Sequence, residues 1–211
     1  MTGALLETFL YALVALIVIV DPAGTAALFA AMTPQDTPAE RAEQARRAVF
    51  IAFLVLAAFG LAGEGLLRAL GIGLPAMQIA GGILLFLSAA DMVTARNVLR
   101  ATPEEQAAAI RTNEDISVFP LAIPLLAGPG AMTTMVLLRS AAGDDWRKVA
   151  AVELALAVAL ALTFAALRLA GQLKRVLGET GSHVAGRVLG VLLAALAAQI
   201  TLDGVRAVLA R

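Results

Sequence analysis

The stretch LLETFLYALVALIVIVDPAGTAALFAAM, residues 5–32, is apolar over most of its length, but Asp21, Pro22 and Gly24 interrupt it past its middle. A helix needs about 20 predominantly apolar residues to cross a hydrocarbon core of about 30 Å. As one straight helix this stretch would extend about 42 Å, which is longer than a crossing requires. Proline removes a backbone donor and glycine permits unwinding, so the stretch predicts a membrane-spanning helix broken at DPAG.

Five further apolar stretches are long enough to cross a bilayer: 47–67, 71–92, 116–138, 149–167 and 187–208. Of the 211 residues, 60% are hydrophobic and 15% charged, whereas a soluble domain carries roughly 25% charged residues. The apolar runs are continuous rather than alternating, which favours helices over a barrel. We therefore expect an all-α integral membrane protein in which residues 1–211 form one transmembrane domain of six helices.

The second half of the chain repeats features of the first. Aligning IVIVDPAGTAALF (17–29) with IPLLAGPGAMTTMV (123–136) at their prolines gives an offset of 107 residues, and aligning AGGILLFLSAAD (80–91) with LGVLLAALAAQ (189–199) gives 108. The agreement suggests two three-helix repeats, about 1–95 and about 116–211, joined by a polar loop at about 96–115. Three is odd, so the repeats would be inverted, as in many secondary transporters. The first and fourth helices would each be broken near mid-membrane; a simple proline kink is the alternative.

The distribution of basic residues indicates an orientation. Ten of the sixteen Lys and Arg residues fall in or beside the first, third and fifth connections, and six on the other side. Cytoplasmic loops carry the excess of such residues. We expect a multi-pass protein of a bacterial or archaeal inner membrane, with the 96–115 loop in the cytoplasm and both termini outside.

Composition also argues against several classes of function. Net charge is zero and the basic residues are scattered, which argues against nucleic-acid binding. The chain has no cysteine, hence no thiolate metal site. Neither a phosphate-binding loop nor an intramembrane protease motif is present. We expect no enzyme activity, no cofactor and no bound metal.

Each helix break would expose backbone N–H groups at the positive end of a half-helix. In the first half these belong to Gly24 and Thr25, and in the second to Gly130 and Ala131. Inversion would bring the two ends together near the midplane. Such a pair suits a carboxylate or another small anion.

Asp21 is the carboxylate expected near mid-membrane at this pair of breaks. A buried charge at such depth is costly, so it is a functional candidate by default. It could attract an ammonium group, hold a cation or carry a proton. Alternatively it caps the amides of Ala23 and Gly24, and the two roles are compatible.

Other polar residues of the apolar segments are weaker candidates. Thr133 and Thr134 could line a cavity or bond back to their own helix, and Gln199 could line a pathway or bond to a neighbouring helix. The candidate substrate-binding residues are Asp21, Pro22, Gly24, Thr25, Gly128, Pro129, Gly130, Ala131, Thr133 and Gln199.

Four motifs resemble the MarC family: DPAG (21–24), AGGILLF (80–86), PLAIPLLAGPGAM (120–132) and RVLGVLLAALAAQITLDG (187–204). These six-helix inner-membrane proteins are similar to the LysE-type exporter superfamily, and some transport small neutral amino acids such as glycine and alanine. The resemblance implies inverted repeats with substrate held between the broken first and fourth helices. The family's first motif usually reads DPxGNxP; Thr25 and Ala27 replace its Asn and second Pro here, which puts any contact made through that Asn in doubt.

The leading hypothesis is a secondary transporter of small neutral amino acids. Proton or sodium coupling, import or export, and oligomeric state stay open. The alternatives are a non-transporting membrane scaffold and an exporter of another small solute or of a metal ion, for which the intramembrane ligands are few.

Overall fold

The computed structural model describes residues 2–33, 36–94 and 116–210. All regular structure in these ranges is helical, which confirms the predicted all-α class. The elements are α1 (Thr2–Val20), α2 (Pro22–Met32), α3 (Pro38–Ala69), α4 (Leu74–Thr94), the irregular π-type segment η1 (Ser117–Leu126), α6 (Pro129–Ala142), α7 (Trp146–Arg168) and α8 (Ala170–Leu209). The predicted loop at 96–115 lies outside the described residues.

Four helical stretches of the described chain are long and apolar enough to cross a membrane: Gly3–Ala30, Pro38–Ala69, Trp146–Arg168 and Gly190–Leu209. The first of these contains both α1 and α2. A fifth forms if η1 and α6, bent by 53° at their junction, count as one span. The predicted span at 71–92 corresponds to α4, whose described apolar part, Leu74–Leu87, is shorter than a crossing. The structure thus supports four or five of the six predicted spans.

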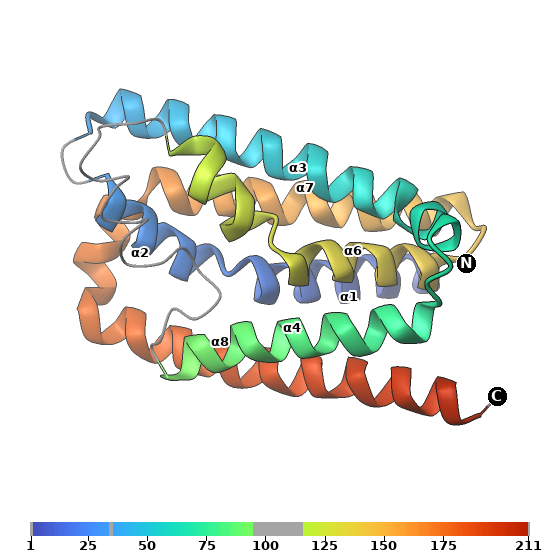
Figure 1. Ribbon diagram of the computed structural model, residues 1–211. Helices are drawn as coiled ribbons and strands as arrows, with labels where there is room; N and C mark the ends of the chain where they lie inside the picture. The colour runs from blue at the N-terminus through green and yellow to red at the C-terminus, as the bar shows by residue number, and fades with distance from the viewer. Residues whose placement is uncertain (1, 34–35, 95–115, 211) are drawn as a thin grey trace.

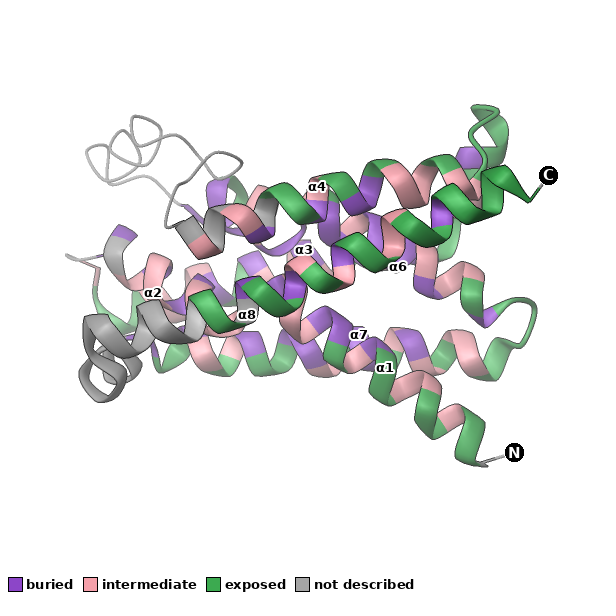
Figure 2. Cartoon of the chain, turned by 90° about the horizontal axis from the view of Figure 1, so that it is seen from below, coloured by how far each residue is buried: buried purple, intermediate pink, exposed green. Residues whose placement is uncertain are grey.

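The outward surface of the bundle is apolar. Large hydrophobic side chains such as Leu54, Phe86 and Leu192 are about half exposed. In Figure 2 the exposed residues follow the outer faces of α4 and α8, whereas buried residues lie toward neighbouring helices. A monomeric soluble protein rarely exposes such extensive apolar surface, so this face suits lipid.

The helices lie along one common direction as a layered bundle (Figure 1). α4 packs along α8; α3 packs on α6, α7 and η1; and α1 packs on α7 and α6. Small residues recur on the buried stripe of α3: Ala45, Ala48, Ala52, Gly60 and Gly63. Small side chains let helix backbones approach closely, which matters because lipid supplies no hydrophobic drive for helices to associate.

Both termini lie at the same end of the bundle in both views (Figures 1 and 2). The α3–α4 and α6–α7 connections lie at this end too, while α3 begins and α7 ends at the opposite one. This agrees with termini on one side of a membrane; which side stays a prediction.

Two helices are longer than the apolar runs that predicted them. α3 begins at Pro38 instead of 47, because Thr37 and Glu40 form a capping box and Glu43 pairs with Arg46 and Arg47. α8 begins at Ala170 instead of 187, so the predicted fifth connection is helical. Polarity excludes that segment from the bilayer core, but it does not prevent helix formation.

The topology can be tested by cysteine labelling, because the chain has no native cysteine. Asp144→Cys lies in the exposed α6–α7 connection at the end of the termini, and Ala39→Cys lies in the exposed first turn of α3 at the other end. A membrane-impermeant maleimide should label Asp144→Cys in intact cells and Ala39→Cys only after permeabilisation. The reverse pattern would invert the orientation, and external labelling of both would contradict the opposite-ends arrangement.

Candidate functional site between two helix breaks

The first break is a single residue. Asp21 separates α1 from α2 and adopts a left-handed conformation, with φ 49° and ψ 71°. Helical hydrogen bonding continues on both sides of it: its amide bonds to the Ile17 carbonyl at 3.0 Å, and its carbonyl accepts from the Thr25 amide at 2.9 Å. The chain is therefore interrupted here without a long unwound segment, which is narrower than the predicted break.

The Asp21 side chain is the N-cap of α2. Its Oδ1 accepts a hydrogen bond from the Gly24 amide at 3.0 Å, and Pro22 occupies the start of the helix, where no amide is needed. Only 2% of Asp21 is exposed. The capping interpretation is thus confirmed at Gly24, and the carboxylate is also buried, as a functional candidate at this depth would be.

The second break is wider. Before it, η1 departs from helical dihedrals at Phe119 and Ile123, and Ala127 and Gly128 separate it from α6. No side chain caps α6, whose N-cap residue is Gly128. The Met132 amide bonds to the Gly128 carbonyl at 3.0 Å, so the earlier amides of the first turn, Gly130 and Ala131, are those without a side-chain cap. Within the described chain this half-helix start has no side-chain cap, unlike that of α2.

Both breaks lie near the middle of the bundle's long axis (Figure 1). α2 and α6 lead away from them in opposite directions, and α1 lies beside α6 along its length. α2 also contacts η1. The two breaks therefore lie at a similar level along the bundle, and the predicted meeting of the two half-helix starts stays a prediction.

The hydroxyls of Thr25 and Thr133 at the two breaks already donate hydrogen bonds to backbone carbonyls. Thr25 donates to the Val20 carbonyl across the first break at 2.9 Å, and Thr133 donates to the Pro129 carbonyl at 2.9 Å. Thr134 is 4% exposed, and its hydroxyl oxygen has no hydrogen-bond partner in the described part of the chain. The prediction that one of the paired threonines bonds back to its own helix is confirmed for Thr133.

The start of α6 packs tightly on α4. A Cβ added to Gly130 would lie 2.5 Å from Cδ2 of the buried Leu85, and one added to Gly81 would overlap the Thr133 side chain. On the other side of the break, a Cβ at Gly128 would lie 2.6 Å from the Pro124 carbonyl oxygen. At these three positions neighbouring atoms lie so close to the backbone that only glycine fits without a shift. Leu85 and Gly81 are site residues that the sequence argument missed, since only packing identifies them.

Gln199 stands apart from the other candidates. It is exposed on α8, and its amide nitrogen donates to the Asp203 carboxylate at 2.8 Å within the same helix. The remaining candidates, Pro22, Gly128 and Pro129, form the backbone of the two breaks themselves. In the described residues no three metal-ligating side chains gather into a possible metal site.

Glu153 of α7 is a further polar group, which was not among the candidates chosen from the sequence. Its Oε1 is buried without a hydrogen-bond partner in the described residues, and it would lie 2.7 Å from a Cβ built on Gly60 of α3. The available signal was a carboxylate inside the apolar run 149–167.

The comparisons with known proteins agree with the membrane assignment. A family model described as MarC family integral membrane protein matches residues 6–209. An Archaeoglobus fulgidus "UPF0056 membrane protein" is 35% identical over 206 residues, covering 94% of this chain and 92% of the relative. "UPF0056 inner membrane protein YhgN" of Escherichia coli K12 is 33% identical over 195 residues, covering 92% and 94%. None of these names states a substrate, and no solved structure matches.

Substitutions at Asp21 can test two contributions to stability: the side-chain hydrogen bond that caps α2 and the left-handed backbone conformation. Asp21→Ala removes the cap and places alanine at positive φ, so it should cost about 1–3 kcal/mol of stability. Asp21→Asn keeps a capping oxygen and tolerates this conformation, so its unfolding midpoint in detergent should stay close to that of the wild type.

Asp145→Ala is the matched control. Asp145 caps α7 by accepting from the Arg147 amide, but its φ of −76° suits any residue. Asp145→Ala should therefore lose less stability than Asp21→Ala does. Equal losses of stability in the two alanine variants would contradict the idea that the positive φ at residue 21 adds a cost of its own.

Proposed function

The chain belongs to the MarC family of integral membrane proteins, and from this premise we propose that it is a secondary transporter of small neutral amino acids of the glycine and alanine class. The observation that carries the proposal is an uncapped helix start at one break and a buried carboxylate at the other, with both breaks near the middle of the bundle. Coupling to a proton or sodium gradient and the direction of transport stay open.

The start of α6 would hold the carboxylate of the substrate. The first-turn amides of Gly130 and Ala131 have no side-chain cap, and the helix dipole makes this end positive. The start of α2 cannot serve equally, because Asp21 already accepts from Gly24 and brings a negative charge of its own. The two ends thus have complementary rather than identical roles.

Asp21 would attract the ammonium group. It is a buried charged side chain inside an apolar bundle, where charges are rare and mark ion or substrate pathways. An amino acid carries one group for each end of such a site. A zwitterion therefore fits the pair better than a simple anion or cation does.

Tight packing favours a small substrate. Leu85 lies against Gly130, and Thr133 lies against Gly81. With the Thr25 and Thr133 hydroxyls bonded to backbone carbonyls, recognition would rest on charge and shape rather than on hydrogen bonds to a polar substrate side chain. Glycine and alanine meet these conditions.

We further propose that the halves α1–α4 and η1–α8 are inverted repeats that rock about the site. Exchanging α1 for η1, α2 for α6, α3 for α7 and α4 for α8 preserves most helix contacts. The α1–α7 contact becomes η1–α3, α2–α7 becomes α6–α3, and α2–α8 becomes α6–α4, all of which occur. Such exchange symmetry is what alternating access between two repeats requires.

The decisive measurement is uptake of radiolabelled glycine and alanine into proteoliposomes, with and without imposed proton and sodium gradients. Asp21→Asn should insert and fold but lose affinity by roughly ten- to a hundred-fold, because a hydrogen bond to a charged group contributes about 1.5–3 kcal/mol. Asp144→Asn removes a carboxylate from an exposed connection and should transport as the wild type does.

Two results would count against this proposal. Absence of flux for both amino acids under every gradient would favour a scaffold or another solute. Wild-type flux by Asp21→Asn across the pH range would make that aspartate structural and leave the site to the amides of α6 alone.

A further inference from the structure

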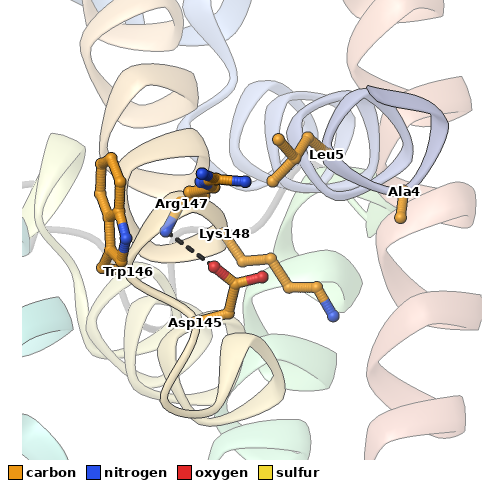
Figure 3. A pocket seen from close by; sticks show the side chains of 6 residues that line it. All are labelled: Ala4, Leu5, Asp145, Trp146, Arg147 and Lys148. Atoms are coloured by element: carbon orange, nitrogen blue, oxygen red, sulfur yellow. Dashed lines mark hydrogen bonds between the residues drawn. The ribbon is translucent and has the colours of Figure 1, made fainter. Parts of the chain in front are cut away.

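A cavity lies at the end of the bundle that carries the termini. It has a volume of about 280 Å³ and is lined by Ala4 and Leu5 of α1 and by Asp145, Trp146, Arg147 and Lys148 at the start of α7. Figure 3 shows these side chains around the space between the two helices. The cavity is far from the helix breaks and takes no part in the proposed transport.

The cavity lies at the depth of lipid headgroups. The spans Gly3–Ala30 and Trp146–Arg168 both end beside it. Trp146 is 72% exposed, as expected of a residue of the aromatic belt at a membrane–water interface. Below it the outer surfaces of α1 and α7 are apolar, for example at Leu10 and Leu154. A molecule in this cavity would therefore have its polar part in the interface and its apolar part along the bundle.

Basic side chains outnumber acidic ones among the residues that line the cavity. Asp145 is engaged as the cap of α7, with its Oδ1 accepting from the Arg147 amide at 3.0 Å. The Arg147 guanidinium stacks 5.7 Å from the centre of the Trp146 ring, which leaves its N–H donors available. Within the described residues neither Arg147 nor Lys148 forms an ion pair, whereas Arg68 and Arg206 at the same end of the bundle do. Among the residues that line the cavity, two cations accompany one carboxylate that already caps α7, which gives the lining a net charge of +1.

This charge and size match a phosphodiester. A guanidinium and an ammonium together bind phosphate oxygens well, the first through paired donors and the second as a point charge. The volume is at the lower end of small-molecule sites, large enough for a glycerophosphate headgroup but not for a whole lipid. Ala4 and Leu5 offer apolar contact to the start of an acyl chain.

We propose that this cavity binds the headgroup phosphate of an anionic phospholipid such as phosphatidylglycerol. Arg147 and Lys148 hold the phosphate, Trp146 orients the guanidinium, and the lipid bridges the N-terminal turn of α1 to the start of α7. The proposal is independent of transport activity.

Binding in this cavity can be followed by tryptophan fluorescence, because Trp146 is the only tryptophan of the chain. The full-length protein in a neutral detergent is titrated with phosphatidylglycerol, phosphatidylethanolamine, phosphatidylcholine or inorganic phosphate while Trp146 emission is recorded. Phosphatidylglycerol should shift the emission saturably, and the other three should not. In the double variant Arg147→Gln/Lys148→Gln the half-saturating lipid concentration should rise about ten-fold or more.

The matched control is Arg68→Gln/Arg206→Gln, which removes the same charge from the same end of the bundle but leaves the cavity intact. It should titrate as the wild type does. The dependence on lipid concentration is compared rather than the starting emission, because loss of Arg147 changes the surroundings of Trp146 directly. An equal response to zwitterionic lipid, an equal response to inorganic phosphate, or an unchanged titration of the Arg147→Gln/Lys148→Gln variant would each overturn the proposal.

Discussion

The hydrogen bond from the Gly24 amide to the Asp21 carboxylate holds together the first helix break inside the bundle. In a bilayer no water can satisfy an exposed backbone amide, so a break at this depth persists only where protein groups replace the missing partners. Asp21 does so with its side chain, while its own amide and carbonyl keep the hydrogen bonds of the flanking helices. Thr25 adds a bond to the Val20 carbonyl. At this break the Asp21 amide and carbonyl, the Gly24 amide and the Val20 carbonyl all hold hydrogen bonds.

The second break differs from the first because no side chain of the described residues caps the helix that follows it. Gly128 carries no capping side chain, and η1 and α6 are bent by 53° at their junction. Thr133 satisfies the Pro129 carbonyl, but no side chain in the described chain caps the first amides of α6. A bundle with one closed and one open helix start is polarised across its centre. The proposed binding of a zwitterion depends on that asymmetry rather than on the presence of two breaks.

The sequence could predict the parts of this arrangement that depend on local chemistry. The lengths of the apolar runs predict the helices. The positions of both breaks are predicted from Asp21, Pro22, Gly128 and Pro129. It could not predict that α8 begins at Ala170, because a polar segment outside the bilayer has no periodic signal that separates helix from loop. Nor could it identify Leu85 as a neighbour of Gly130, since that contact depends on how α4 and α6 meet.

Thr133 shows why the second break and the helix packing depend on each other. Its hydroxyl turns back to the Pro129 carbonyl, which directs its methyl group toward Gly81 of α4. A larger residue at 81 would collide with that methyl group, and relieving the collision by rotating Thr133 would remove a hydrogen bond from the first turn of α6. Gly60 and Gly63 of α3 approach Met135 and Val136 on the same helix in a similar way. α6 is thus positioned by small residues on two neighbouring helices, so a movement of α3 or α4 would be transmitted to the open helix start through direct contact.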